Sequence, residues 1–387
     1  MKTISDLNFR NKTVLLRTDI NSDIVNGRVL MSERIRKSAE TIKELKKKKA
    51  KVVILAHQGR PGENDFIGLK EHARLLNRLT KIEFVPDIIG ERALNKIRSL
   101  KPGKALLLEN IRFLKDEFEP DKRPNKIIEN LVPLSDIYVN DAFSVCHRNH
   151  TSITEFPNYL QSCAGRILEK EVNALKKIKI KNKSTLFILG GAKPEDNIRL
   201  LKVLKESRML TCGLFGQLCL IAKGKNLGAQ NKYLKDKLHL IDELKKAVKN
   251  SEKVSTPVDF GVKVNGKRKE LALDGFPSRY EIYDIGRKTI DRYLKEIEKS
   301  KTIFMKGPAG DCGINGFCVG TAAILRGIAR NKGFSLIGGG HLNDAIKKSG
   351  INRKKFGYIS LSGGALVRYI AGEKLPGLEA LRWSKVK

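Results

Sequence analysis

The amino-acid sequence predicts an α/β protein with parallel, doubly wound sheets and about two domains. Short apolar runs alternate with helical segments along the chain, which is the order that builds a parallel sheet. The chain has 387 residues, enough for about two domains of ordinary size. This rhythm is interrupted near residue 166 and then resumes, so the expected domain boundary lies there.

Four apolar runs in the first half of the chain end in polar or basic residues. These runs are 14–16, 52–55, 105–108 and 137–139, with helical segments such as 33–47 between them. Ligands of parallel sheets bind beyond the carboxyl ends of the strands, so the side chains that follow are expected to share one edge. The candidates are Asp19, Asn21, Arg34, His57, Arg60, Arg112, His147, Arg148 and His150.

Arginine and histidine dominate this set, and this predicts an anion site. Guanidinium forks bind carboxylates and phosphates bidentately, so a rim of arginines suits a multiply charged phosphate ester. A single arginine after a strand is more often a surface ion-pair partner, and a single histidine is more often structural. Arginine or histidine follows several of these apolar runs, and this repetition favours an anion site over a chance arrangement of basic residues.

Residues 166–182 are predicted to form a helix that joins the two halves. Leu168, Val172, Leu175 and Ile178 recur at helical spacing on one face. The polar stretch 181–184 is the expected end of this helix. The alternative is an ordinary surface helix within one domain.

The second half opens with the apolar run 186–189, followed by Gly190, Gly191 and Lys193 at the expected start of a helix. Glycine lets backbone N–H groups approach an anion closely, and the lysine adds a positive charge, so this corner predicts a phosphate site. This corner lacks the residue spacing of a Walker A loop. The alternative is a structural role, because glycine corners between a strand and a helix often serve only close packing.

Further glycine corners follow the later apolar runs, as a nucleotide lying on bare backbone would require. They lie at 212–213, 283–286, 307–310, 338–340 and 363–364. The chain contains no GxGxxG motif, so a dinucleotide-dependent dehydrogenase is not supported.

Composition limits the remaining function classes. The net charge of +34 is compatible with a nucleic-acid partner, but the lysines lie on helix faces without interleaved aromatics, and a solvated basic surface is favoured. Six scattered cysteines without CxxC pairs predict neither a disulfide nor a zinc site. The absence of an apolar leader or a run of membrane length predicts a soluble, cytoplasmic protein.

In order and spacing, the motifs resemble those of phosphoglycerate kinase, particularly its archaeal branch. They are RTDIN, SERI, AHQGRPG, LLENIRF, YVNDAF, CHRNH, LEKE, ILGGAK, GPAG, GGGH and LSGG, followed by the tail 375–381. Any one of these motifs is weak, but together they cover almost the whole chain.

This resemblance implies two Rossmann-like lobes joined by a hinge. Residues 1–165 would form the phosphoglycerate lobe, completed by the returning tail 372–387. Residues 166–182 would form the hinge helix, and 183–371 the nucleotide lobe. The implied reaction is the reversible, Mg²⁺-dependent transfer of a phosphoryl group from 1,3-bisphosphoglycerate to ADP, giving 3-phosphoglycerate and ATP in glycolysis. The implied state is a monomer or homodimer, without a membrane or specific nucleic-acid partner.

The resemblance also implies roles for individual residues, with no side chain assigned to a metal. Arg34, Lys193, Gly340 and Gly363 would be catalytic. The phosphoglycerate would be held by Asp19, Asn21, Arg34, His57, Gln58, Gly59, Arg60, Arg112 and Arg148. The nucleotide would be held by Gly191, Lys193, Gly213, Gly286, Pro308, Gly338, Gly339, Gly340 and His341. Arg34 and Lys193 would act on the transferred group from the two lobes, with hinge closure excluding water.

The nucleotide half departs from the family pattern. Asn197 stands where many members carry a second lysine, His341 replaces an aspartate, Cys212 replaces a glycine, and Ser362 opens the last triplet. Gly313 replaces a glutamate that reaches the ribose. An active kinase with altered nucleotide handling is therefore the leading hypothesis. A catalytically weakened binding protein is the second, and a basic nucleic-acid-associated protein the third.

Overall fold

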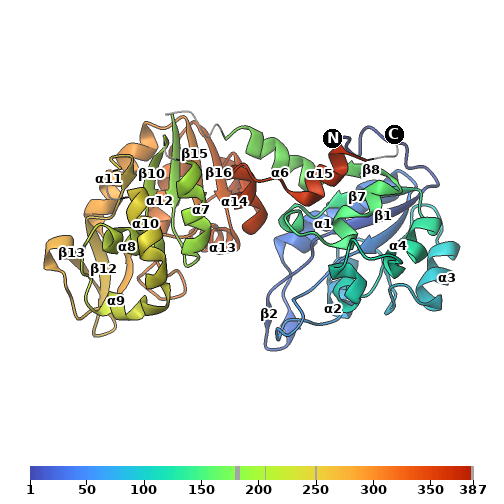
Figure 1. Cartoon of the computed structure of the whole chain (residues 1–387), viewed down its shortest axis with the longest axis horizontal. Coiled ribbons are helices and arrows are strands. Elements are labelled where there is room, and N and C mark those ends of the chain that lie inside the picture. Colours follow the sequence, from blue (N-terminus) through green and yellow to red (C-terminus); the bar gives the residue numbers. More distant parts are fainter. Residues whose placement is uncertain (179–183, 205, 249–250, 385–387) are drawn as a thin grey trace. The chain divides into compact units, whose positions relative to one another are not determined.

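The computed structural model describes residues 1–178, 184–204, 206–248 and 251–384 (Figure 1). The chain divides into two compact units. Unit 1 comprises Met1–Asn173 and Lys374–Lys387, and unit 2 comprises Ala174–Glu373. Each unit has its own parallel sheet and its own apolar core. No helix within the described ranges is both long and apolar enough to cross a membrane.

The sheet of unit 1 has six parallel strands in the order β5-β6-β4-β1-β7-β8. Their bounds are β1 Thr13–Thr18, β4 Lys51–Leu55, β5 Glu83–Phe84, β6 Ala105–Leu107, β7 Ile137–Asp141 and β8 Gln161–Ala164. The apolar runs expected from the sequence fall in β1, β4, β6 and β7, which confirms the parallel α/β class. A small hairpin, β2 Ile24–Val25 and β3 Arg28–Val29, follows β1.

Helices of unit 1 cover this sheet, and the last helix runs from unit 1 into unit 2, which begins at Ala174. They are α1 Glu33–Lys47, α2 Lys70–Asn77, α3 Glu91–Ser99, α4 Lys126–Leu131, α5 Thr151–Thr154 and α6 Arg166–Lys176, with short 3₁₀ turns η1 Ile111–Phe113, η2 Lys115–Phe118, η3 Val132–Leu134, η4 Phe143–Val145 and η5 Phe156–Asn158. Helix α1 has the predicted bounds. It begins where the Ser32 hydroxyl accepts a hydrogen bond from the Ile35 N–H, and it buries Ile35, Ala39, Ile42 and Leu45 on one face.

The C-terminal helix α15, Pro376–Arg382, packs on α5 and β8 of unit 1 (Figure 1). The Gly377 N–H donates to the carbonyl of Cys146 at 2.9 Å. A Cβ atom at position 377 would lie 2.6 Å from Cγ2 of Ile153, so only glycine allows this approach. Leu378 and Leu381 are buried in the same contact.

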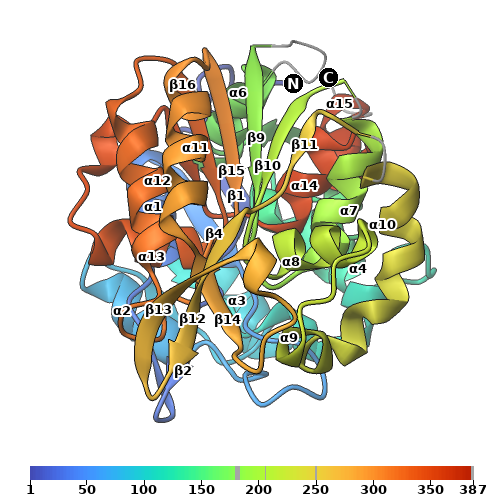
Figure 2. The same cartoon turned by 90° about the vertical axis from the view of Figure 1, so that its left-hand side faces the viewer.

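The sheet of unit 2 also has six parallel strands, in the order β11-β10-β9-β15-β16-β17 (Figure 2). Their bounds are β9 Thr185–Leu189, β10 Arg208–Thr211, β11 Val254–Ser255, β15 Thr302–Lys306, β16 Phe334–Gly338 and β17 Tyr358–Ser360. Helices α11 and α12 lie on one face, and α7, α8 and α10 lie on the other. The central strands β9 and β15 are buried almost completely.

The helices of unit 2 begin mostly at the carboxyl ends of its strands. They are α7 Pro194–Val203, α8 Gly213–Ala222, α9 Ala229–Tyr233, α10 Ile241–Val248, α11 Arg287–Glu298, α12 Val319–Arg330, α13 Gly340–Lys348 and α14 Gly364–Ile370, with 3₁₀ turns η6 Lys235–Leu240, η7 Leu273–Gly275 and η8 Arg353–Lys355.

Unit 2 contains a second sheet that the sequence did not predict, and the joining helix ends earlier than expected. The corner 283–286 belongs to an antiparallel sheet, β13-β12-β14, and not to the parallel one. Its strands are β12 Asp259–Val264, β13 Lys267–Ala272 and β14 Ile282–Ile285, and Asn265-Gly266 forms the β12–β13 turn with positive φ at both residues. The joining helix α6 ends at Lys176, before the expected end at 181–184; residues 179–183 lie outside the described residues.

The prediction that the cysteines form no disulfide was also wrong. Cys312 and Cys318 are bonded, and they close the segment between β15 and α12. Their Cα atoms are 4.4 Å apart because the chain turns back within six residues, a spacing that matches no CxxC pattern. The other four cysteines are buried thiols, and burial raises the pKa of Cys146 to about 12.

Candidate functional site

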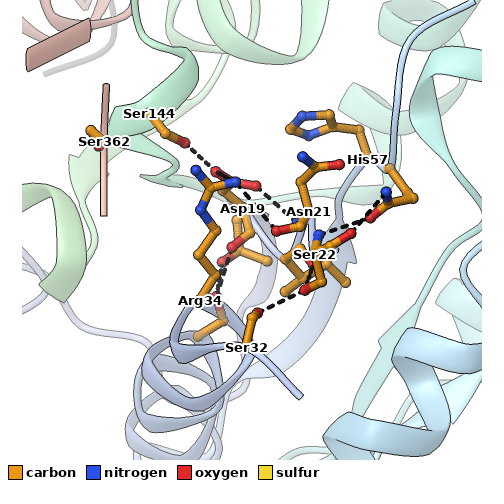
Figure 3. A network of polar contacts seen from close by, with 12 residues as sticks. Asp19, Asn21, Ser22, Ser32, Arg34, His57, Ser144 and Ser362 are labelled. Carbon is orange, nitrogen blue, oxygen red and sulfur yellow. Dashed lines mark hydrogen bonds and ion pairs between the residues drawn. The ribbon is translucent and has the colours of Figure 1, made fainter. Parts of the chain in front are cut away.

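In unit 1, the segment after β1 brings Asp19 and Arg34 together (Figure 3). Asp19 is buried, and its Oδ2 lies 3.3 Å from Nη1 of Arg34 and also accepts a hydrogen bond from Ser144. Its Oδ1 accepts the N–H of Asn21 at 3.0 Å. Arg34, in the first turn of α1, keeps 28% of its side chain exposed, so its guanidinium is fixed but accessible.

The segments after β1 and β4 are tied together by amide side chains. Asn21 Oδ1 accepts the N–H of Gly59 at 2.9 Å. Gln58 is fully buried, accepts the N–H of Ser22 at 2.9 Å and donates to the Ser22 carbonyl at 3.1 Å. These bonds hold the two strand ends in one register, and they give Asn21, Gln58 and Gly59 a positioning function in the structure.

His57 lies in a strongly positive environment. Burial lowers its pKa well below 6.5, and Arg17, Arg112 and Arg34 lower it further. The ring is therefore neutral near pH 7. Nη2 of Arg17 lies 3.2 Å from His57 Nδ1, and because arginine can only donate, Nδ1 is the acceptor and Nε2 carries the proton. His57 thus offers an N–H donor without adding charge.

Arg112 belongs to the same group of charges. Burial lowers its pKa to about 10, Arg17 and Arg148 lower it, and Glu117 and Asp19 raise it. Its Nη1 donates to the Gly59 carbonyl at 2.5 Å. Arg112 therefore shares its electrostatic environment with Arg17 and Arg148, and Arg34 acts with Arg112 on the pKa of His57.

Arg60 is placed differently. Its side chain is 61% exposed, and Nη1 lies 3.6 Å from Oε1 of Glu63 on the same loop. Of the two histidines in the 147–150 segment, His150 lies with Nδ1 3.6 Å from the buried Glu117 carboxylate. His147 is half-buried. A direct ligand contact for Arg60 stays a prediction.

Arg17 is a charged residue of unit 1 that was not among the candidates expected from the sequence. It lies inside β1 and is fully buried, with Nε donating to Ser152 Oγ at 2.8 Å. It contacts His57 and lowers the pKa of both His57 and Arg112. The available signal was an arginine directly after the apolar residues 14–16 of one strand. A guanidinium group is buried in such a place only where partners compensate its charge.

In unit 2, a pocket of about 400 Å³ lies among the ends of β9, β10 and β15, the strand β14 and the helix α13. Of the residues expected to hold the nucleotide, it is lined by Gly191, Gly213, Pro308 and His341. Gly313 lies on its wall, beside Asp311 and the disulfide-bonded Cys312. The other expected residues are not among its lining residues; these are Lys193, Gly286, Gly338, Gly339 and Gly340. Cβ atoms at Gly286 and Gly338 would overlap Asp259 and Leu366.

The glycine corner after β9 does not present its N–H groups as expected. The N–H of Gly190 donates to the Lys306 carbonyl at 2.7 Å, and that of Gly191 donates to the Pro308 carbonyl at 2.8 Å. A Cβ at Gly190 would lie 2.5 Å from the Pro308 oxygen. These glycines therefore allow two strand-end loops to pack closely, and the prediction that their N–H groups bind an anion was wrong.

Other glycines of unit 2 face open space. A Cβ built on Gly340 or Gly363 would meet no atom within 4 Å, so packing within the protein does not require glycine there. Gly339 has φ +113°, which favours glycine by conformation, and it caps α13. Lys193 is exposed and caps α7, beside the helix N-terminus.

The chain is similar to known proteins of one family over nearly its whole length. The family model described as phosphoglycerate kinase matches residues 4–373. Phosphoglycerate kinase of Methanopyrus kandleri is 39% identical over 395 residues, covering 98% of this chain and 97% of that protein. The Sulfurisphaera tokodaii enzyme is 41% identical over 402 residues, covering 99% and 96%. The crystal structure of phosphoglycerate kinase from Pyrococcus horikoshii matches with a TM-score of 0.93 at 35% identity, covering 99% of both chains.

Proposed function

This chain belongs to the phosphoglycerate kinase family, and we infer from that premise that its residues carry out the family's phosphotransferase reaction. 1,3-Bisphosphoglycerate gives its acyl phosphate to ADP, and 3-phosphoglycerate and ATP are the products. The following assignment of residues to this reaction is our proposal.

The observation that carries the proposal is the group of cations around His57 in unit 1. Arg17, Arg34 and Arg112 all act on the pKa of this one ring. Mutual repulsion makes such a group unfavourable on its own, and an anion with several charges relieves it. Phosphoglycerate carries a carboxylate and a phosphate, so it suits this site. Arg34 would bind the substrate directly because its side chain stays accessible, whereas Arg17 would hold His57 in position.

The nucleotide would bind in unit 2, in the pocket beside β14 and α13. The pocket wall supplies apolar surface from Leu214, Ile282 and Pro308 for the base. The open backbone at Gly340 and Gly363 leaves room for phosphate oxygens, and Lys193 adds a charge at the start of α7.

The chemistry requires positioning and charge neutralisation more than a reactive side chain. Phosphoryl transfer moves a group whose equatorial oxygens carry the charge, so cations directed at them lower the barrier. Arg34 would supply such a cation to the bound phosphoglycerate, and Lys193 would supply one to the nucleotide phosphates. Neither residue has to gain or lose a proton in this mechanism.

Mg²⁺ would come with the nucleotide and not from a dedicated protein site. The described part of the chain contains no group of three or more His, Cys, Asp or Glu side chains able to hold a metal ion. Mg²⁺ commonly takes phosphate and water oxygens as ligands, so this arrangement fits the ion's chemistry. When bound, it would neutralise part of the phosphate charge.

The test combines a coupled assay with titration calorimetry. We expect the purified protein to turn over ATP and 3-phosphoglycerate in the presence of Mg²⁺. Arg34→Ala should lower turnover by roughly 10³- to 10⁵-fold, by analogy with other arginines that act on transferred phosphoryl groups. Arg36→Ala is the matched control, because Arg36 lies on the same helix with its side chain 51% exposed and paired with Glu33.

Each outcome bears on the assignment. Equal rates in the two variants would remove Arg34 from the mechanism. Strong heat from 3-phosphoglycerate, without heat from ADP and without turnover, would instead identify a weakened binding protein.

A further inference from the structure

Lys306 is a buried lysine at the functional edge of the sheet in unit 2. It is the last residue of β15 and is only 7% exposed. Its strand pairs with β9, so Lys306 lies beside the end of β9 and the start of α7. Lysine is rarely buried in a protein unless a partner or a ligand compensates its charge.

The ammonium group of Lys306 is held at the first turn of α7. Nζ lies 3.2 Å from Oδ2 of Asp196 and 3.3 Å from Oδ1 of Asn197. Asn197 is itself oriented, because its Nδ2 donates to the Gly190 carbonyl at 2.9 Å. Two side chains of α7 therefore hold the ammonium group of Lys306 in one position.

Lys306 is in direct contact with one carboxylate and is influenced by a second lysine, Lys193. Burial lowers the pKa of Lys306, Asp196 and Glu195 act in the opposite direction, and the neighbouring Lys193 lowers this pKa further. Asp196, the carboxylate that contacts it, keeps 31% of its side chain exposed. Lys193 and Lys306 both bring positive charge to the N-terminus of α7, where a bound anion would be stabilised.

We propose that Lys306 is a second phosphate-binding residue of the nucleotide site and acts with Lys193 on the phosphates of ADP and ATP. This inference rests on the proposed function and deepens it. Sequence reasoning left Lys193 as the only lysine of this corner, because position 197 is asparagine. The structure supplies the second ammonium from β15, within hydrogen-bond distance of that asparagine.

The competing explanation is a structural ion pair that fastens α7 to the sheet. The two explanations differ in whether loss of the lysine changes ligand binding or the stability of the folded unit. A phosphate-binding lysine affects ligands that carry phosphates, whereas a structural lysine affects the folded unit whatever the ligand.

The first experiment uses Lys306→Met, which keeps much of the side-chain length and removes the charge. We expect ADP affinity, measured by titration calorimetry with Mg²⁺, to fall roughly 10- to 100-fold, as for the loss of a charged hydrogen bond. Adenosine inhibition and 3-phosphoglycerate affinity should change by less than about twofold. Lys301→Met is the matched control, since Lys301 is exposed and precedes the opposite end of the same strand.

The second experiment moves the ammonium group between the two positions. The double variant Lys306→Asn with Asn197→Lys should recover ADP affinity to within about fivefold of the wild type, because the two side chains occupy neighbouring space. This variant also keeps the test decisive if Lys306→Met does not fold. A folded double variant that has lost ADP binding would overturn the proposal.

Two further results would overturn it as well. One is unchanged ADP affinity in Lys306→Met, and the other is an equal loss of affinity for adenosine and ADP. Failure of the proposed function is distinguishable, because it would appear as absence of turnover in the wild-type protein.

Discussion

Asp141 provides a quantitative test of how burial controls stability. It is the last residue of β7 and is fully buried, and its Oδ1 accepts the N–H groups of Ile167 and Leu168 at 2.7 and 3.2 Å. It therefore caps the first turn of α6. Burial nevertheless raises its pKa from the ordinary 3.8 to about 7.

The sign of the pH effect follows from this rise. Between about pH 4 and pH 7 the native carboxyl keeps its proton while the unfolded chain has lost it, so stability falls as the pH rises. Each pH unit costs about 1.4 kcal/mol within this window. From pH 5 to pH 7 the expected loss is on the order of 2 kcal/mol, and the contribution becomes constant only well above pH 7, where the carboxyl is ionised in both states.

Asp141→Asn removes the titration but keeps an acceptor for both N–H groups. We expect its free energy of unfolding to lack the downward slope of the wild type between pH 5 and pH 7. Urea unfolding at half-unit pH intervals would measure this, followed by circular dichroism and by the fluorescence of Trp383, the only tryptophan, which adjoins α15 in unit 1. Asp136→Asn, at an exposed carboxylate just before the same strand, is the control. Parallel pH profiles for wild type and Asp141→Asn would refute the reasoning.

Three other substitutions test separate parts of the structure. Gly377→Val should destabilise unit 1 by roughly 1–3 kcal/mol because its Cβ would overlap Ile153, and urea unfolding that is unchanged would contradict the observed packing of α15. Gly340→Ala should leave the melting temperature within a few degrees of wild type and weaken ADP binding severalfold, since the new methyl group enters open space; calorimetry showing normal affinity would exclude Gly340 from the phosphate site. Cys318→Ser should destabilise unit 2 by about 2 kcal/mol by opening the loop that the disulfide with Cys312 closes, whereas equal unfolding curves with and without reductant would show that the bond does not stabilise the unit.

Much of the fold was predictable because the residues that are buried in the structure also form hydrophobic patterns in the sequence that are typical of strands and helices. The apolar runs of the parallel strands are buried on both faces, so they read as continuous hydrophobic segments. Helix α1 was predicted to the residue because Ser32 caps it and the charges lie on its outer face. The antiparallel β12–β13 hairpin was missed although Asn265-Gly266 is a strong hairpin signal, because the strand–helix rhythm on either side dominated the interpretation.

The candidate site was predictable only in part. The basic strand ends of unit 1 do converge, since parallel topology brings the carboxyl ends together. The glycine corner after β9 was misinterpreted because the sequence does not reveal which N–H groups already have acceptors. The acceptors are the carbonyls of Lys306, at the end of β15, and Pro308, in the loop after it, both more than 100 residues away along the chain. Lys306 was missed for the same reason, since its partners Asp196 and Asn197 are equally distant along the chain.

The separation of unit 1 into two stretches of chain has a consequence for biosynthesis. Unit 2 is continuous over Ala174–Glu373, so the ribosome has made all of it before Lys374 is added. The surface around Cys146 and Ile153 receives α15 only after this point. The unit whose strands are translated first is therefore the last to be completed, and its unfinished surface stays in contact with water while the rest of the polypeptide is synthesised.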